Sequence, residues 1–203
     1  QDNAIIFESL GDEADDTNRV YFASLGRMIN QMLAETGFRL CKGDNMAANP
    51  QWCQPLPVWK KYFSDWICMP GNEELLEISI FFDFRFCYGD PTLSDDLREF
   101  ISTGLRTNDI FFHHMAEGWG HFSPVISSLP SGISDIKKIL MPLVGLTRLY
   151  TLKNSIKKFR TTERLFEMNR VNCIDRRMMN SVMRAWKDLT AIRLMHQASC
   201  IYR

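Results

Sequence analysis

The sequence has no long apolar run. The longest apolar runs span only a few residues, such as Ile78 to Phe82, which Ser79 interrupts, whereas a membrane-spanning helix needs about 20 apolar residues. We therefore expect no transmembrane helix and no membrane partner. Disorder is also excluded as the main state, because 45% of the 203 residues are hydrophobic and 12% are aromatic. Since the chain opens at Gln1 without a basic and apolar leader, we expect it to be a segment of a longer protein.

Closely paired cysteines are also lacking, because none of the six forms a Cys-x-x-Cys pair. Several stand in apolar stretches, such as Cys87 between Phe86 and Tyr88, so we expect buried thiols of a reducing cytoplasm. Neither a disulfide framework nor a cysteine zinc site has the required spacing, and any metal should be held by oxygen ligands. The P-loop, dinucleotide-binding and esterase motifs are missing as well, which leaves those functions without support.

The net charge is zero, but the charges are unevenly distributed. Residues 1–134 hold 9 Lys and Arg against 19 Asp and Glu, while residues 135–203 hold 15 against 5. An acidic part could bind cations and a basic part phosphate groups, although most such side chains simply face solvent. The asymmetry predicts two parts with different partners.

The first 91 residues show apolar patterns of both strands and helices. Short or alternating apolar runs predict strands over residues 3–7, 38–41 and 76–87. Helical spacing predicts a helix over 17–36, stopped by Gly37, and another from Pro57 to Pro70 with an aromatic core face.

After Gly89 the pattern is helical, with Ser94 as the expected cap of the first helix. A stripe from Met179 to Leu189 in the last helix is typical of a bundle core. The fold class is therefore α+β, with a small α/β part over 1–91 followed by an all-α bundle over 92–203. The expected helices cover 94–105, 110–119, 142–152, 162–168 and 175–196, with a Gly/Ser/Pro-rich linker over 118–132.

Two polar features of this pattern have more than one interpretation. Asp83 stands in the middle of the apolar stretch 76–87, where burying a carboxylate requires a salt bridge, with Arg85 or a distant partner, or a metal ion. His113, Glu117 and His121 have the spacing of zinc ligands on one helix, but Gly118 and Gly120 indicate that the helix ends before His121.

Several stretches together resemble a family of nucleotidyltransferases related to protein-PII uridylyltransferase and DNA polymerase β-like enzymes. The family occurs in bacterial signalling proteins behind CBS and cyclic-nucleotide-binding domains. The resemblance covers nearly the whole chain, and its helical part is similar to the family's substrate-binding domain. It rests on residues 1–7, 41–43, 46–50 and 79–85, and more weakly on 135–138, Pro142, Arg148, 162–165 and 193–197.

The resemblance implies a partial polymerase β-like mixed sheet with helices, followed by the all-α bundle. Asp2 matches the second acid of the family's Asp-x-Asp motif and Asp83 matches the third carboxylate, so both are expected to be catalytic ligands of Mg²⁺ or Mn²⁺. The first Asp and the preceding Gly-Ser turn would lie upstream of Gln1. We therefore expect this segment by itself to be inactive or nearly so.

The implied function is transfer of a nucleoside monophosphate from an NTP to a protein or small-molecule acceptor, in a signalling protein with upstream CBS or cyclic-nucleotide-binding domains. The alternative is a non-catalytic nucleotide-sensing or scaffolding module, and nucleic-acid binding ranks last. The candidates for nucleotide contacts are Arg85, Lys42, Lys137, Lys138 and Arg148.

Overall fold

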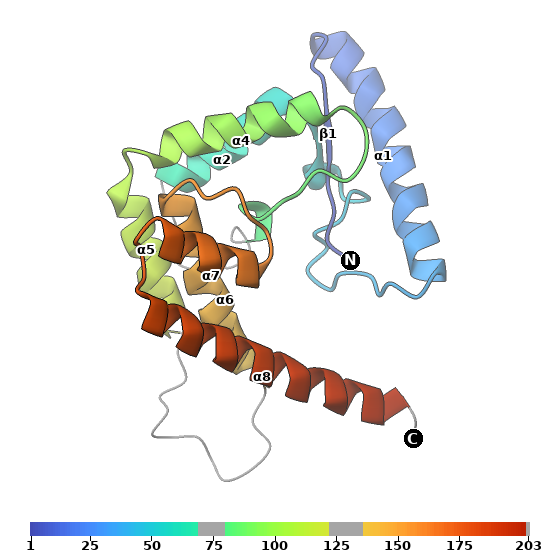
Figure 1. Ribbon diagram of the computed structural model, residues 1–203. Helices are drawn as coiled ribbons and strands as arrows, with labels where there is room; N and C mark the ends of the chain where they lie inside the picture. The colour runs from blue at the N-terminus through green and yellow to red at the C-terminus, as the bar shows by residue number, and fades with distance from the viewer. Residues whose placement is uncertain (69–79, 122–135, 202–203) are drawn as a thin grey trace. The chain divides into compact units, whose positions relative to one another are not determined.

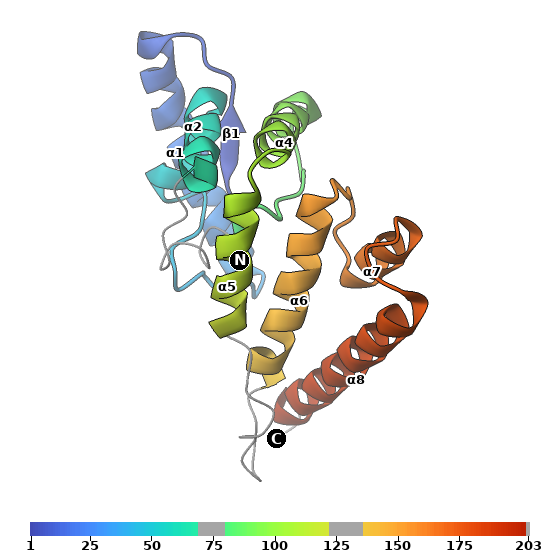
Figure 2. The same cartoon turned by 90° about the vertical axis from the view of Figure 1, so that its left-hand side faces the viewer.

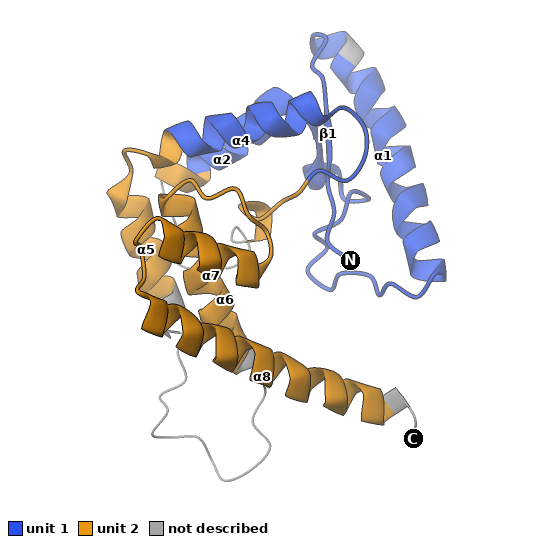
Figure 3. Cartoon of the chain, viewed as in Figure 1, with its two compact units in different colours: residues 1–65, 86–103 blue, residues 66–85, 104–203 orange. Residues whose placement is uncertain are grey.

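The computed structural model describes residues 1–68, 80–121 and 136–201 (Figure 1). It divides into two compact units (Figure 3). Unit 1 comprises residues 1–65 and 86–103, and unit 2 comprises residues 66–85 and 104–203. The chain thus passes between the units three times. The domain limits 1–91 and 92–203, which follow from the sequence, stay a prediction.

Unit 1 is built around a small parallel sheet, and this confirms the α+β class. Strand β1 (Ile5–Phe7) pairs in parallel with β2 (Cys53–Pro55), and Ile5 lies opposite Cys53. Helix α1 (Asp12–Glu35) lies alongside β1 (Figure 1) and contacts both strands. The other elements of this part are the 3₁₀ turn η1 (Pro50–Trp52), α2 (Leu56–Cys68), which runs on into unit 2, and α4 (Pro91–Leu105).

Aromatic packing fixes these helices on the sheet. The rings of Phe7 in β1 and Phe22 in α1 stack with centroids 4.9 Å apart. The Trp59 indole of α2 is buried and donates a hydrogen bond from Nε1 to the carbonyl oxygen of Ile5, at 3.1 Å. Phe63, one turn further along α2, is also buried, which confirms the predicted aromatic core face.

The stop of α1 at Gly37 is confirmed. Gly37 has a φ of +97°, a left-handed conformation that favours glycine. The backbone N–H of Phe38 then reaches back to the carbonyl oxygen of Leu33, at 3.0 Å. Helix α1 begins at Asp12, five residues before the predicted Thr17, because the acidic stretch after Gly11 forms its first turns.

Unit 2 contains the predicted helical bundle. Figure 2 shows α6 between α5 on one side and α7 with α8 on the other, and the helix contacts agree. Buried Leu165 and Met168 of α7 pack with Met179 and Met183 of α8, which confirms the predicted apolar stripe at those two positions. The helices are α5 (Asp109–His121), α6 (Ile136–Lys153), α7 (Thr161–Arg170) and α8 (Arg176–Ile201).

The predicted strand over 76–87 is wrong where the structure describes it, from residue 80 onward. Ile80 and Phe81 are helical, and a turn follows in which the N–H of Asp83 donates to the carbonyl oxygen of Ile80, at 3.1 Å. Consecutive Phe81 and Phe82 are both buried, against the alternation of a strand. Their rings pack on Trp66, so side-chain packing outweighs the strand preference of these residues.

Three smaller expectations are also wrong. Residues 38–41 form no strand. The cap before α4 is Asp90, whose Oδ1 accepts from the N–H of Thr92 at 2.9 Å, whereas Ser94 lies inside the helix. Helix α5 continues to His121, although Gly118 and Gly120 had predicted that it ends before that residue.

All six cysteines are free, but only Cys53 is buried. Cys87 is exposed, contrary to the prediction from its apolar neighbours, because the strand that would bury it does not form. No helix among the described residues is long and apolar enough to cross a membrane.

Candidate functional site

Asp2 lies in unit 1, exposed and just before β1. The residues on both sides of it are held by hydrogen bonds. Asn3 Oδ1 accepts from the N–H of Ala47 at 2.8 Å and from Asn30 Nδ2 at 3.0 Å. Gln1 Oε1 accepts from the same Asn30 amide at 2.9 Å. The backbone around Asp2 is therefore fixed, while its carboxylate remains accessible.

Asn30 of α1 organises this region. The residue is only 3% exposed, and its Oδ1 accepts from the N–H of Ala48 at 2.9 Å. One α1 residue thus joins the N-terminal segment to the loop over residues 41–49, which we call the Lys42 loop. A buried side-chain amide is costly unless its polar atoms have hydrogen-bond partners, and those of Asn30 have them.

Lys42 is exposed in a turn of this loop, closed by the N–H of Asp44 and the carbonyl oxygen of Cys41 at 3.2 Å. The N–H of Asn3 donates to the carbonyl oxygen of Asn45 at 3.2 Å. The structure therefore brings the segment that carries Asp2 and the loop that carries Lys42 together within unit 1.

Asp83 lies in unit 2 between two arginines. Arg148 of α6 donates from Nε and Nη2 to Asp83 Oδ2, at 3.0 and 2.9 Å. Arg164 of α7 donates from Nη1 to Oδ2 at 3.3 Å and from Nη2 to Oδ1. The side chains of Asp83, Arg148 and Arg164 are only 19%, 15% and 6% exposed. We call these three residues the arginine clamp.

The clamp is a desolvated charge cluster. Burial lowers the pKa of the Arg148 guanidinium below its usual value, and the nearby Arg164 lowers it further, while Asp83 opposes both effects. Arg164 also donates from Nε to the carbonyl oxygen of Lys158, at 2.7 Å.

Arg148 was a phosphate candidate from the sequence, whereas the role of Arg164 was missed. The only signal for it is a charged residue next to the core positions Leu165 and Met168.

Among the remaining candidates, the structure describes only the side chain of Arg85. Arg85 is exposed and forms no ion pair with Asp83. The strand pattern had placed the two residues on one face, where such a pair was one interpretation. The side chains of Lys137 and Lys138 lie outside the described part of the structure. Asp2 and Asp83 belong to different units, so no distance between them follows.

No group of three or more His, Cys, Asp or Glu side chains that could hold a metal ion occurs among the described residues. His113 Nε2 lies 3.4 Å from Glu117 Oε1, and His114 Nδ1 lies 3.7 Å from Glu117 Oε2. The side chain of His121, the third member of that spacing, lies outside the described part. Two histidines that flank one exposed carboxylate are typical of a solvated helix surface.

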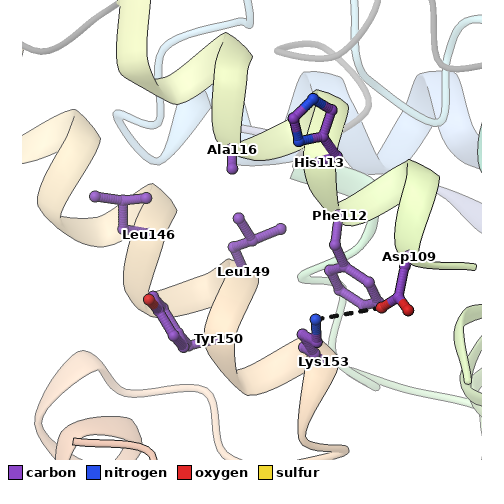
Figure 4. Close-up of a pocket in the computed structure, with 8 residues that line it drawn as sticks. All are labelled: Asp109, Phe112, His113, Ala116, Leu146, Leu149, Tyr150 and Lys153. Carbon is purple, nitrogen blue, oxygen red and sulfur yellow. Dashed lines mark hydrogen bonds and ion pairs between the residues drawn. The ribbon is translucent and has the colours of Figure 1, made fainter.

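Unit 2 also has a groove of about 510 Å³ between α5 and α6. Figure 4 shows Phe112 and Ala116 of α5 facing Leu146 and Leu149 of α6. One end carries the ion pair of Lys153 Nζ and Asp109 Oδ1, at 3.3 Å. Other lining residues are His113 and Tyr150. The groove thus combines an apolar floor with a cation at its rim, as small-molecule sites often do.

Comparison with known families completes this description. Residues 1–73 match the family described as Putative nucleotidyltransferase DUF294. Residues 110–203 match the family described as Putative nucleotidyltransferase substrate binding domain. These two stretches therefore belong to the two domains of one family, described as putative nucleotidyltransferases. The first match contains Asp2 and the Lys42 loop, and the second contains both arginines of the clamp and nearly all of the groove. No curated protein and no solved structure matches the chain.

Proposed function

We propose that the protein transfers a nucleoside monophosphate from an NTP to an acceptor hydroxyl, with Mg²⁺ or Mn²⁺ bound through Asp2. The observation that carries this proposal is the family match on both parts of the chain, with Asp2 exposed in a rigid setting within the first part. Phosphoryl transfer requires little covalent chemistry from a protein and depends on positioning and charge neutralisation.

The donor set at Asp2 fits a divalent cation in part. An exposed carboxylate next to a fixed backbone offers the oxygen ligand that Mg²⁺ prefers. The resemblance implies a further Asp and a Gly-Ser turn ahead of Gln1, which would add a second carboxylate to the set. When bound, the metal would neutralise the triphosphate and activate the attacking oxygen. Asp83, the other predicted ligand, is not included here because its oxygens already bind two guanidinium groups.

Lys42 is the best-supported phosphate contact. It is exposed, and its loop is bonded to the segment that carries Asp2. An ammonium there could bind a phosphate oxygen next to the metal. Arg85, Lys137 and Lys138 stay predictions, and the pairing of Arg148 with Asp83 favours a structural role for that arginine.

We assign acceptor binding to the groove of unit 2. Residues 110–203 match the substrate binding family, and they include nearly all residues that line this groove between α5 and α6. Its volume falls in the range of small-molecule sites. Uridylylation or adenylylation of a signalling protein, under control of upstream CBS or cyclic-nucleotide-binding domains, is implied by the resemblance alone.

The test is labelled-NTP turnover with Mg²⁺ by a version extended at its N-terminus with the Asp and the Gly-Ser turn. Asp2→Asn should abolish pyrophosphate release, while Glu8→Gln, another exposed carboxylate of unit 1, should not. Lys42→Ala should raise the KM for NTP about tenfold, and Arg27→Ala, an exposed cation on α1, should leave it unchanged. Unaltered turnover in Asp2→Asn would refute the metal assignment.

Acceptor binding is tested once a screen by pyrophosphate release has found an active hydroxyl compound. Tyr150→Ala removes one aromatic wall of the groove and should raise the KM for that acceptor about tenfold without a change in the KM for NTP. Tyr21→Ala is the matched control, because it removes an exposed tyrosine from α1, outside the groove. Equal effects of both variants would remove the groove from the proposal.

A non-catalytic module remains the second candidate, and one observation favours it. The carboxylate expected to be the third metal ligand is engaged by two arginines. NTP binding by the extended version without turnover, across the same acceptor screen, would support this alternative.

A further inference from the structure

The arginine clamp ties together three segments that are distant in sequence. Asp83 lies in the turn that follows helical Phe81, Arg148 lies on α6 and Arg164 lies on α7. Sixty-five residues separate Asp83 from Arg148, and 81 separate it from Arg164. No strand pairing holds the Asp83 segment in the described part of unit 2, so these bonds supply its polar anchor.

The clamp also connects two apolar clusters of unit 2. Next to Asp83, Phe82 packs on Phe111 of α5 with ring centroids 5.1 Å apart. Next to Arg164, Leu165 is buried in the core formed with α8. The three charged groups therefore lie between hydrophobic layers, where water reaches them poorly and each ionic hydrogen bond is strong.

Both carboxylate oxygens of Asp83 accept hydrogen bonds from guanidinium groups. A metal ion at this carboxylate would have to displace these bonds and would meet two cations at close range. Electrostatic repulsion between a dication and two partly buried guanidinium groups is strongly unfavourable at short distance. The contacts of Asp83 therefore do not fit those of a metal ligand.

We propose that Asp83 is the anionic partner of Arg148 and Arg164 and is not a metal ligand. Its bonds to these arginines fix α6 and α7 against the segment of Asp83, which carries the buried rings of Phe81 and Phe82. This assignment is independent of nucleotide transfer. It predicts that removing one partner is far more damaging than removing all three charges, because a lone buried charge keeps its desolvation cost without its partner.

The experiment is a mutant cycle followed by thermal unfolding, with either Mn²⁺ or EDTA present. Asp83→Asn should lower the Tm by about 10 °C equally in both conditions. In the background of Arg148→Met with Arg164→Met, the same change should lower the Tm by less than about a third of that amount. Glu8→Gln, the same loss of a carboxylate at an exposed position outside the proposed metal site, should leave the Tm unchanged in both conditions.

Mn²⁺ affinity, measured by electron paramagnetic resonance, separates the two roles. Folded Asp83→Asn should bind Mn²⁺ as the parent does. The proposal is overturned by an unchanged Tm, by additive effects in the cycle, or by an affinity loss of about tenfold or more in Asp83→Asn. If Asp83→Asn does not fold, Arg148→Lys replaces it. That variant keeps the charge but loses the paired hydrogen bonds, and a metal-independent fall in Tm of about 5 °C is expected, whereas an unchanged Tm refutes the clamp.

Discussion

Gly26 of α1 lies against the backbone of the Lys42 loop, and this contact makes a sharp prediction. A Cβ atom at Gly26 would lie 2.3 Å from the carbonyl oxygen of Ala47 and 2.7 Å from its carbonyl carbon. Both are backbone atoms, and the next residue is bonded to buried Asn30. The clash can be relieved only if the loop moves away from α1.

The expected effect of Gly26→Ala is a loss of stability of about 1–3 kcal/mol. Alanine in a helix interior would by itself gain about 0.5–1 kcal/mol, and the steric overlap with a fixed backbone exceeds that gain. For a unit of this size, the loss corresponds to a fall in Tm on the order of 10 °C. Because the loop carries Lys42, NTP affinity should fall as well.

The assay is thermal unfolding followed by far-UV circular dichroism, with Gly104→Ala as the control. A Cβ at Gly104 in α4 would meet only the flexible Cδ1 of Ile67, at 3.3 Å. The same substitution there should be neutral or slightly stabilising. If Gly26→Ala were as stable as Gly104→Ala, the close packing of the loop on α1 would be refuted.

Three further predictions concern single side chains. Asn30→Ala should lower the unfolding free energy by about 3 kcal/mol, because it orphans several buried polar groups, while exposed Gln31→Ala should change it by less than about 0.5. Hydrogen bonds from Thr92 lower the pKa of Asp90, so its stabilisation is complete above the unfolded value of about 4 and is lost as the pH falls through the folded value. The stability difference between wild type and Asp90→Ala, measured by urea unfolding, should therefore shrink on acidification. Burial raises the pKa of the Cys53 thiol to about 11, so mass spectrometry after brief alkylation should find the exposed cysteines modified and Cys53 intact until unfolding.

Much of the fold follows from local patterns in the sequence. The helix ended by Gly37 and the aromatic face of α2 are predictable because one residue type, or one spacing, dominates the local free energy. The start of α1 is not predictable in this way, because the stretch from Asp12 has few apolar residues. There the helix is favoured by acidic side chains near its N-terminus.

The stretch around Asp83 shows where local patterns fail. Alternating phenylalanines satisfy the pattern of a strand, but a strand also needs a hydrogen-bonding neighbour, and none is paired with it in the described residues. The sequence did allow a salt bridge with a distant partner for Asp83. It could not select Arg148 and Arg164 among so many basic residues, because the choice depends on how α6 and α7 pack.

The same placement changes how the charge asymmetry of the sequence should be understood. By sequence, Asp83 belongs to the acidic part over residues 1–134, together with Asp2. By structure, it belongs to unit 2, which holds 17 Lys and Arg against 11 Asp and Glu, while unit 1 holds 7 against 13. A carboxylate in the basic unit is held by arginines, and an exposed carboxylate in the acidic unit has the environment that favours a cation. We therefore propose different roles for these two aspartates, which the resemblance assigned to one metal site, and we expect the metal chemistry of this protein in unit 1.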